Sequence, residues 1–192
     1  MCFGIRVLLY SEFLSGVVIG LFLPVYYLFI EQIGGDPLDS GIGFGVYSIV
    51  NGTFTLGLGR FGNKLNKKAL VVSGYLFLCL GTAGYLLIKT PIHFIIVQGI
   101  LGVGVGMSNV CSSALYSIWM ERGKETAVWG YNMGGFEIIF TFAAVLGGWM
   151  VKNFGFHDVF LLMLAVQLAS LLFAWKVLKT DEAGRLQVAG RR

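Results

Sequence analysis

The sequence predicts an all-α integral membrane protein built as a bundle of six transmembrane helices, and three observations lead to this class. Of the 192 residues, 56% are hydrophobic and only 12% are charged, whereas a soluble domain carries about 25% charged residues. This apolar fraction excludes an intrinsically disordered chain, and 28 glycines without a Gly-X-Y period exclude collagen. The apolar residues also fall into runs long enough to cross about 30 Å of hydrocarbon as helices.

Six such runs follow one another with short connections. We expect membrane-spanning helices over residues of about 5–30, 41–58, 68–88, 92–120, 126–151 and 157–178, followed by a mobile cytoplasmic tail over 179–192. The first run is too long for a signal-peptide core and lacks a small-x-small cleavage site, so we interpret it as a retained helix. The short connections make neighbouring helices antiparallel and leave no room for a soluble domain between them.

The basic residues are shared unequally between the two sides of the predicted bundle. If the N-terminus is cytoplasmic, the inner segments and the tail hold twelve Lys and Arg residues, while the outer loops hold only Lys89 and Lys152. This distribution predicts a multi-pass protein of the cell membrane with both termini in the cytoplasm. The net charge of +4 is then a consequence of topology, and no nucleic-acid partner is expected.

The residues that often carry catalysis or bind metals are few and scattered. Cys2, Cys79 and Cys111 form neither a disulfide framework nor a CxxC metal pattern. His93 and His157 lie at the outer ends of their spans, and no HExxH motif occurs. We therefore expect no enzyme activity, no metal and no cofactor.

The two halves of the chain are nearly equal in length, because the third span ends near Ile88 and the sixth near Leu178. The second and fifth spans close in the same way: a glycine, Gly59 or Gly148, then an apolar residue two positions later, then polar and basic residues. One half begins inside and the other outside. The pattern predicts an inverted 3+3 repeat, which is typical of secondary transporters.

The segment over residues 59–68, GRFGNKLNKK, resembles the signature loop G-x-L-x-D-R-x-G-R-R/K between the second and third helices of the major facilitator superfamily. The positions that match are Gly59, Phe61, Gly62, Lys64, Lys67 and Lys68. Asn63 stands where the family has Asp, and Asn66 where it has the second Gly. The sequence Leu23-Pro24-Val25-Tyr26 near the outer end of the first span and Gly147-Gly148-Trp149 at the end of the fifth are also similar to a facilitator.

The resemblance covers residues 8–178 and implies one six-helix half of a fold that normally has twelve spans, with the substrate cavity between two halves. In the family, the loop Asp contributes to a charge network that latches one half to the other. Asn63 keeps a hydrogen bond possible but not the charge, so this latch is absent or built differently. The antiporter patterns of the family are not matched, since Ile95 occupies the Arg position of the fourth span and Ala143-Ala144 replaces Gly-Pro in the fifth.

Two carboxylates lie inside the spans, where ionisable groups are costly and suggest function. Glu137 lies near the middle of the fifth span, so it is interpreted either as a substrate-binding or proton-carrying group or as a structural hydrogen-bonding group. The residues on its face are small, which predicts packing against protein; they are Gly130, Gly134, Thr141 and Gly148.

Glu12, in the inner third of the first span, shares a face with Gly16 and Gly20. This face predicts a helix contact. The carboxylate is a second site candidate, with pairing to Arg6 or snorkelling to the interface as the alternatives.

Polar residues also form stripes at helical spacing. The stripe of the fourth span consists of Gln98, Gly102, Val105, Asn109 and Ser112, and that of the second span of Ser48, Asn51 and Thr55. The resemblance implies that the first and fourth spans face the cavity and that the second flanks it, so both stripes and Tyr26 are candidates for a polar path. The alternatives are interhelical hydrogen bonds for the stripes and an interfacial aromatic belt for Tyr26.

These observations predict a half-transporter that moves a small solute across the lipid bilayer by alternating access, as a homodimer or with a second six-span half. The alternative is a non-transporting truncated chain or accessory subunit that pairs with a carrier. No residue pattern in the sequence names the substrate.

Overall fold

The structure, a computed structural model, describes residues 3–180, and within this range it is helical and contains no strand. The first span consists of α1 (Phe3–Phe22), the short 3-10 turn η1 (Leu23–Val25) and α2 (Tyr26–Gln32). The others are α3 (Pro37–Phe61), followed by the 3-10 turn η2 (Gly62–Lys64), and then α4 (Lys67–Tyr85), α5 (Pro91–Trp119), α6 (Glu125–Phe154) and α7 (Phe156–Leu178). Six helices are thus long and apolar enough to cross a membrane. Most of the predicted tail, residues 181–192, lies outside the described range.

Local sequence signals set where several helices begin. The backbone amide of Asp39 donates a hydrogen bond to the Asp36 carboxylate at 2.9 Å, and the backbone amide of Asp36 donates one to the Asp39 carboxylate at 3.0 Å. The two residues therefore form a reciprocal cap at the start of α3. The Asn66 side chain caps α4 by accepting two backbone amides. Gly155, with φ of +84°, makes the tight connection between α6 and α7, and few other residues adopt this conformation.

The first span is broken near its outer end. Proline lacks an amide hydrogen and its ring clashes with the preceding turn, and at Pro24 the α-helix gives way to a 3-10 turn before it resumes at Tyr26. The single helix expected over residues 5–30 is therefore two helical segments joined by this turn.

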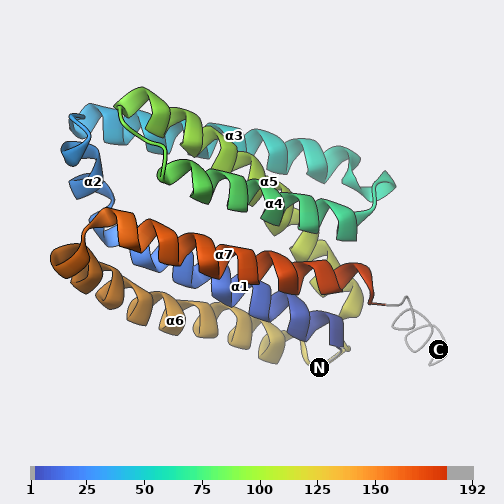
Figure 1. Ribbon diagram of the computed structural model, residues 1–192. Coiled ribbons are helices and arrows are strands. Elements are labelled where there is room, and N and C mark those ends of the chain that lie inside the picture. Colours follow the sequence, from blue (N-terminus) through green and yellow to red (C-terminus); the bar gives the residue numbers. More distant parts are fainter. Residues whose placement is uncertain (1–2, 181–192) are drawn as a thin grey trace.

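The helices form two layers of three, with α1, α6 and α7 in one and α3, α4 and α5 in the other (Figure 1). The contact between α4 and α7 joins the layers. The buried apolar side chains form two clusters in the bundle, one around Leu8 and Tyr116 and the other around Phe22 and Phe94. The helix α1 begins and α7 ends at the same end of the bundle (Figure 1).

Two glycines of α1 allow a close approach to α6. A Cβ atom added at Gly16 would lie 2.9 Å from the Phe136 ring. One added at Gly20 would lie 2.7 Å from the carbonyl oxygen of Phe140 and 2.8 Å from the Ala143 side chain. Only glycine permits this separation between the helices.

The same contact recurs between α5 and α3. A Cβ atom at Gly102 would lie 2.7 Å from the carbonyl oxygen of Tyr47, and one at Gly106 would lie 2.8 Å from both the carbonyl oxygen of Asn51 and the Phe54 side chain. Gly102 and Gly106 of α5 correspond to Gly16 and Gly20 of α1, each 86 positions later. The residues that they contact on α3 correspond in the same way to those on α6, each 89 positions earlier: Tyr47 to Phe136, Asn51 to Phe140 and Phe54 to Ala143. The packing therefore follows the inverted repeat residue by residue.

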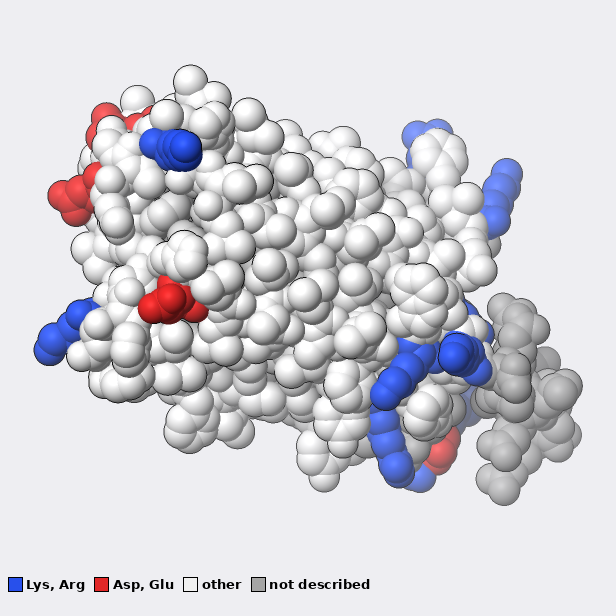
Figure 2. Space-filling model, viewed as in Figure 1, with Lys and Arg blue, Asp and Glu red and all other residues white. Residues whose placement is uncertain are grey.

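Charged side chains gather at the two ends of the bundle's long axis, and the belt between them is uncharged in the view of Figure 2. The end where α1 begins carries mainly basic residues, among them Arg6, Arg60, Lys64, Lys67, Lys68, Arg122, Lys124 and Lys176. The other end carries Glu31, Asp36, Asp39, Lys89, Lys152 and Asp158. This is the distribution expected of a chain whose middle lies in hydrocarbon.

Candidate functional site

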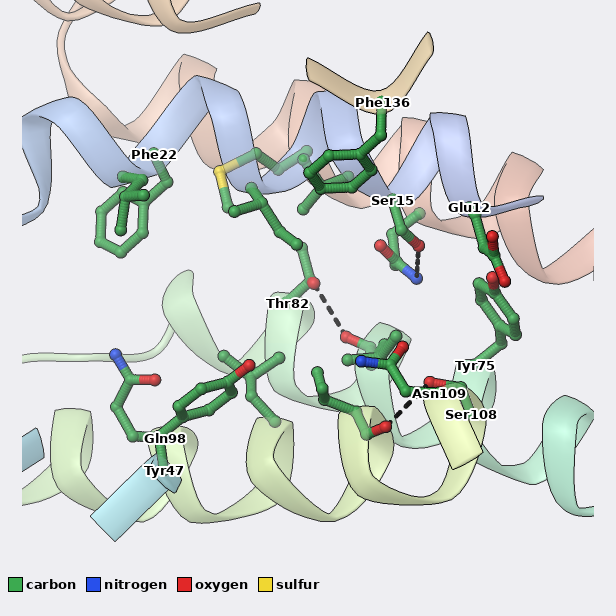
Figure 3. A pocket seen from close by; sticks show the side chains of 18 of the residues that line it. Glu12, Ser15, Phe22, Tyr47, Tyr75, Thr82, Gln98, Ser108, Asn109 and Phe136 are labelled. Carbon is green, nitrogen blue, oxygen red and sulfur yellow. Dashed lines mark hydrogen bonds between the residues drawn. The ribbon is translucent and has the colours of Figure 1, made fainter. Parts of the chain in front are cut away.

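A cavity of about 650 Å³ lies between the two layers of helices. The helices α1 and α5 contribute most of its lining, and α3, α4, α6 and α7 contribute the rest. In Figure 3, side chains of Glu12, Ser15 and Phe22 from α1 and of Gln98 and Asn109 from α5 point toward one another across this space. The volume falls within the range of about 300–1,000 Å³ that is typical of small-molecule sites.

At the end of the cavity toward the acidic loop, a polar chain joins the layers. The Gln98 amide nitrogen donates to the Tyr26 hydroxyl at 3.3 Å, and that hydroxyl donates to the carbonyl oxygen of Ser40 at 3.3 Å. Gln98 is buried, whereas Asn109 is exposed to the cavity farther along α5. These three predicted site residues, Tyr26, Gln98 and Asn109, line one cavity.

At the opposite end, the Glu12 carboxylate is the centre of a second polar cluster. The Tyr116 hydroxyl donates to Oε2 of Glu12 at 2.9 Å, and the Asn132 side-chain amide donates to the same oxygen. Asn132 also lies 3.3 Å from the Tyr116 hydroxyl. The cluster brings together α1, α5 and α6, so it connects the two layers through side chains.

The wall formed by α7 contains polar groups that the sequence interpretation missed. The Gln167 amide nitrogen lies 3.4 Å from the Ser15 hydroxyl, and the Ser170 hydroxyl donates to the carbonyl oxygen of Ser11 at 2.8 Å. Gln167 and Asn132 are isolated polar residues within apolar runs, and that isolation is the only signal by which the sequence marks them.

The predicted stripe on α5 serves two purposes in the structure. Gln98, Val105 and Asn109 line the cavity, whereas Gly102 faces α3 and permits close packing. Asn51 lies outside the cavity lining; its side chain accepts the Thr55 hydroxyl at 3.3 Å on the same helix.

Glu137 also lies outside the cavity, on an exposed face of α6. The glycines of that face, Gly130, Gly134 and Gly148, have no atom within 4 Å of an added Cβ. The expectation that this face packs against protein is therefore not met within residues 3–180, where nothing covers it.

The signature-loop residues continue from the end of α3. Gly59 and Phe61 belong to α3, Gly62 and Lys64 belong to η2, and Lys67 begins α4. The Lys68 ammonium group donates to the carbonyl oxygen of Thr180, which links this loop to the end of α7. The side chain of Asn63, the position where the family has Asp, lies outside the described part of the chain.

Comparison with known proteins agrees with this architecture. The family model described as Major Facilitator Superfamily matches residues 8–192. The chain is 28% identical over 130 residues to "Uncharacterized transporter BU466" of Buchnera aphidicola subsp. Acyrthosiphon pisum (strain APS), which covers 66% of this chain and 32% of the relative. It is 21% identical over 167 residues to "Multidrug resistance protein MdtG" of Escherichia coli (strain K12 / DH10B), covering 85% of this chain and 41% of the relative. The chain thus spans less than half the length of these curated relatives.

Proposed function

Because the chain belongs to the Major Facilitator Superfamily, a family of transporters and not of enzymes, we propose that it forms one six-helix half of a carrier. The carrier moves a small solute across the membrane by alternating access. The observation that carries this proposal is the cavity between the two layers, lined by polar groups at several depths.

The length of the cavity supports a path through the membrane. Its α5 lining extends from Gln98 to Tyr116, and 18 helical residues at a rise of 1.5 Å each correspond to about 27 Å. The hydrocarbon core is about 30 Å thick. The lining therefore extends across most of the apolar belt, as a transport path requires.

The second half of the carrier is proposed to cover outward faces of α3 and α6. On α3, Gly45, Gly52 and Gly59 follow one another at intervals of seven residues and have no atom within 4 Å of an added Cβ. On α6, Gly134 and Gly148 lie 89 positions after Gly45 and Gly59. Small residues at such spacing permit close helix contacts, so both faces suit another six-helix unit, either a second copy of this chain or a separate half.

The orientation follows from the charges. The end of the bundle that is rich in Lys and Arg is placed in the cytoplasm, since basic residues are retained there. Two halves inserted in this same orientation have the parallel relation found between the halves of facilitators. In this arrangement Glu137 lies on the face that packs against the second half, whereas Glu12 is the carboxylate that lines the cavity.

The relative MdtG, which is 21% identical to this chain, is named as a multidrug resistance protein. By extension, we propose a small organic solute for this chain.

Alternating access predicts that cavity positions are reached from both sides of the membrane. In a background in which Cys2, Cys79 and Cys111 are replaced by Ser, Asn109→Cys should react with a membrane-impermeant maleimide in right-side-out vesicles and in inverted vesicles. The reason is that Asn109 lines the cavity and is exposed to it. The measurement is the labelled fraction of the protein after each treatment.

The matched control is Leu172→Cys on α7, whose side chain is exposed outside the cavity and faces lipid. It should stay unlabelled from either side, because a thiol in hydrocarbon does not form the reactive thiolate. Labelling of Asn109→Cys from one side alone would overturn alternating access and favour the accessory-subunit alternative.

A further inference from the structure

The cavity lining contains one acidic side chain and no basic one. Among the described residues that line it, Glu12 is the only Asp, Glu, Lys, Arg or His. The Lys and Arg residues within 3–180 lie at the two ends of the bundle and not beside this carboxylate. An anionic solute would therefore enter an apolar space with no positive partner, whereas a cation would meet a carboxylate.

Several aromatic side chains line the cavity together with the carboxylate. Tyr116, which donates to Glu12 at 2.9 Å, packs its ring against Trp129 with centroids 5.7 Å apart. Tyr75 and Phe136 also line the cavity, and Figure 3 places the Tyr75 ring beside Glu12 and Phe136 near Ser15. Aromatic faces carry partial negative charge, so they attract organic cations and also provide apolar contact for a ligand's body.

The carboxylate is held in position from both layers. Tyr116 belongs to α5 and Asn132 to α6, and both donate to Oε2 of the α1 side chain. A ligand that binds at Glu12 therefore touches a group on which three helices converge. The site is fixed before the ligand arrives, which lowers the cost of binding.

From this arrangement we infer that the cavity binds organic cations, with the positive charge beside Glu12 and the apolar body among Tyr75, Tyr116, Trp129 and Phe136. The inference rests on the proposed function, because it names the class of solute that the same cavity carries. It concerns the charge and aromatic character of the ligand and not one compound.

Two ions of the same shape and opposite charge test the inference. Tetraphenylphosphonium is the cation and tetraphenylborate the anion, and binding of each to the full chain purified in detergent is measured by equilibrium dialysis against empty micelles. Tetraphenylphosphonium should bind at least tenfold more tightly than tetraphenylborate. Glu12→Gln should weaken cation binding at least tenfold, and Glu12→Asp, which keeps the charge, should weaken it less.

The matched control is Glu31→Gln, because Glu31 is exposed at the end of α2 outside the cavity. The Glu31→Gln variant should bind tetraphenylphosphonium as tightly as the unmodified chain does. Equal binding of the two ions, or unchanged cation binding in Glu12→Gln, would overturn the inference. If Glu12→Gln fails to fold, as judged by its elution in size-exclusion chromatography and its thermal midpoint, the binding of the two ions to the unmodified chain still tests whether the cavity prefers a cation.

The labelling of Asn109→Cys separates this inference from the proposed function. Two-sided labelling together with equal binding of both ions leaves a carrier and removes the cation site. One-sided labelling together with Glu12-dependent cation binding retains the site and removes transport.

Discussion

Glu12 and Glu137 are the same residue type in similar apolar surroundings of the sequence, yet the fold gives them different environments. Glu12 accepts hydrogen bonds from Tyr116 and Asn132 and lines the cavity. Glu137 lies on an exposed face of α6 outside the cavity. The candidate that sequence position favours, the carboxylate nearest the middle of a span, is therefore not the one that the fold brings to the cavity, and a role for Glu137 remains a prediction.

The hydrogen bond from Tyr116 to Glu12 should stabilise the bundle. Tyr116→Phe removes the hydroxyl and leaves the carboxylate with one donor fewer, so the free energy of unfolding should fall by about 1–2 kcal/mol. The measurement is unfolding of the purified chain in a denaturing detergent series.

Tyr131→Phe is the control for this substitution, because Tyr131 on α6 is 66% exposed and a change there should stay within about 0.5 kcal/mol. If both variants unfold alike, the Tyr116 hydroxyl contributes nothing to stability.

At the scale of helices, packing depends on where glycine removes a side chain. The α1–α6 and α5–α3 contacts both use two glycines four residues apart. Other glycines of α3, such as Gly57, have open space around them. The glycine content of the sequence does not distinguish these positions. In the structure, some of the glycines allow two helices to approach closely and others do not.

The glycine contacts predict a clear contrast between variants. Gly20→Ala places a Cβ 2.7 Å from the carbonyl oxygen of Phe140 and Gly106→Ala places one 2.8 Å from that of Asn51. Each should lower the free energy of unfolding by about 1–3 kcal/mol, because a backbone atom must move. The two losses should be similar, since the contacts are related by the internal repeat.

Gly57→Ala provides the comparison, because nothing lies within 4 Å of its added Cβ. Alanine favours a helix over glycine by about 1 kcal/mol, so this variant should be as stable as the unmodified chain or more so. A loss at Gly57 as large as that at Gly20 would refute the packing explanation.

For the whole molecule, the cavity and the outward glycine faces together bear on the proposed pairing with a second half. The cavity is bounded by two layers joined through α4 and α7. The outward glycines of α3 and α6 provide faces on which a second half can pack closely. In the proposed carrier, pairing at these faces would complete the wall of the cavity.

If the second half is another copy of the chain, Gly52→Leu should weaken self-association at least tenfold, which corresponds to about 1.4 kcal/mol. The leucine projects from the outward face of α3, where a Cβ added at Gly52 meets open space among residues 3–180, so the fold itself should be unaffected. Mass measurement of the protein in nanodiscs over a concentration series reads the change from dimer to monomer.

Gly57→Leu is matched to this variant: it makes the same substitution on the same helix, on the side away from Gly52 by helical periodicity. It should leave association unchanged. An unmodified chain that is monomeric at every concentration contradicts self-pairing and assigns the second half to different residues or to a different chain.

The sequence by itself determined the six apolar helices, the separation of charges between the two ends, the internal repeat and the family. Each of these depends on local composition, length or spacing, and hydrocarbon imposes strong limits on all three. Glu12, Gln98 and Asn109 stand out as polar residues within apolar runs, and Tyr26 is a candidate from its place in the first span and the family resemblance; all four line one cavity.

Only the tertiary structure decided which polar residues meet. Glu12 finds its partners 104 and 120 positions away, at Tyr116 and Asn132, while Glu137 and Asn51 stay outside the cavity. The physical reason is that lipid and protein interior are equally apolar. Helical periodicity therefore tells which residues share a face, but it does not tell whether that face meets lipid, another helix or the cavity.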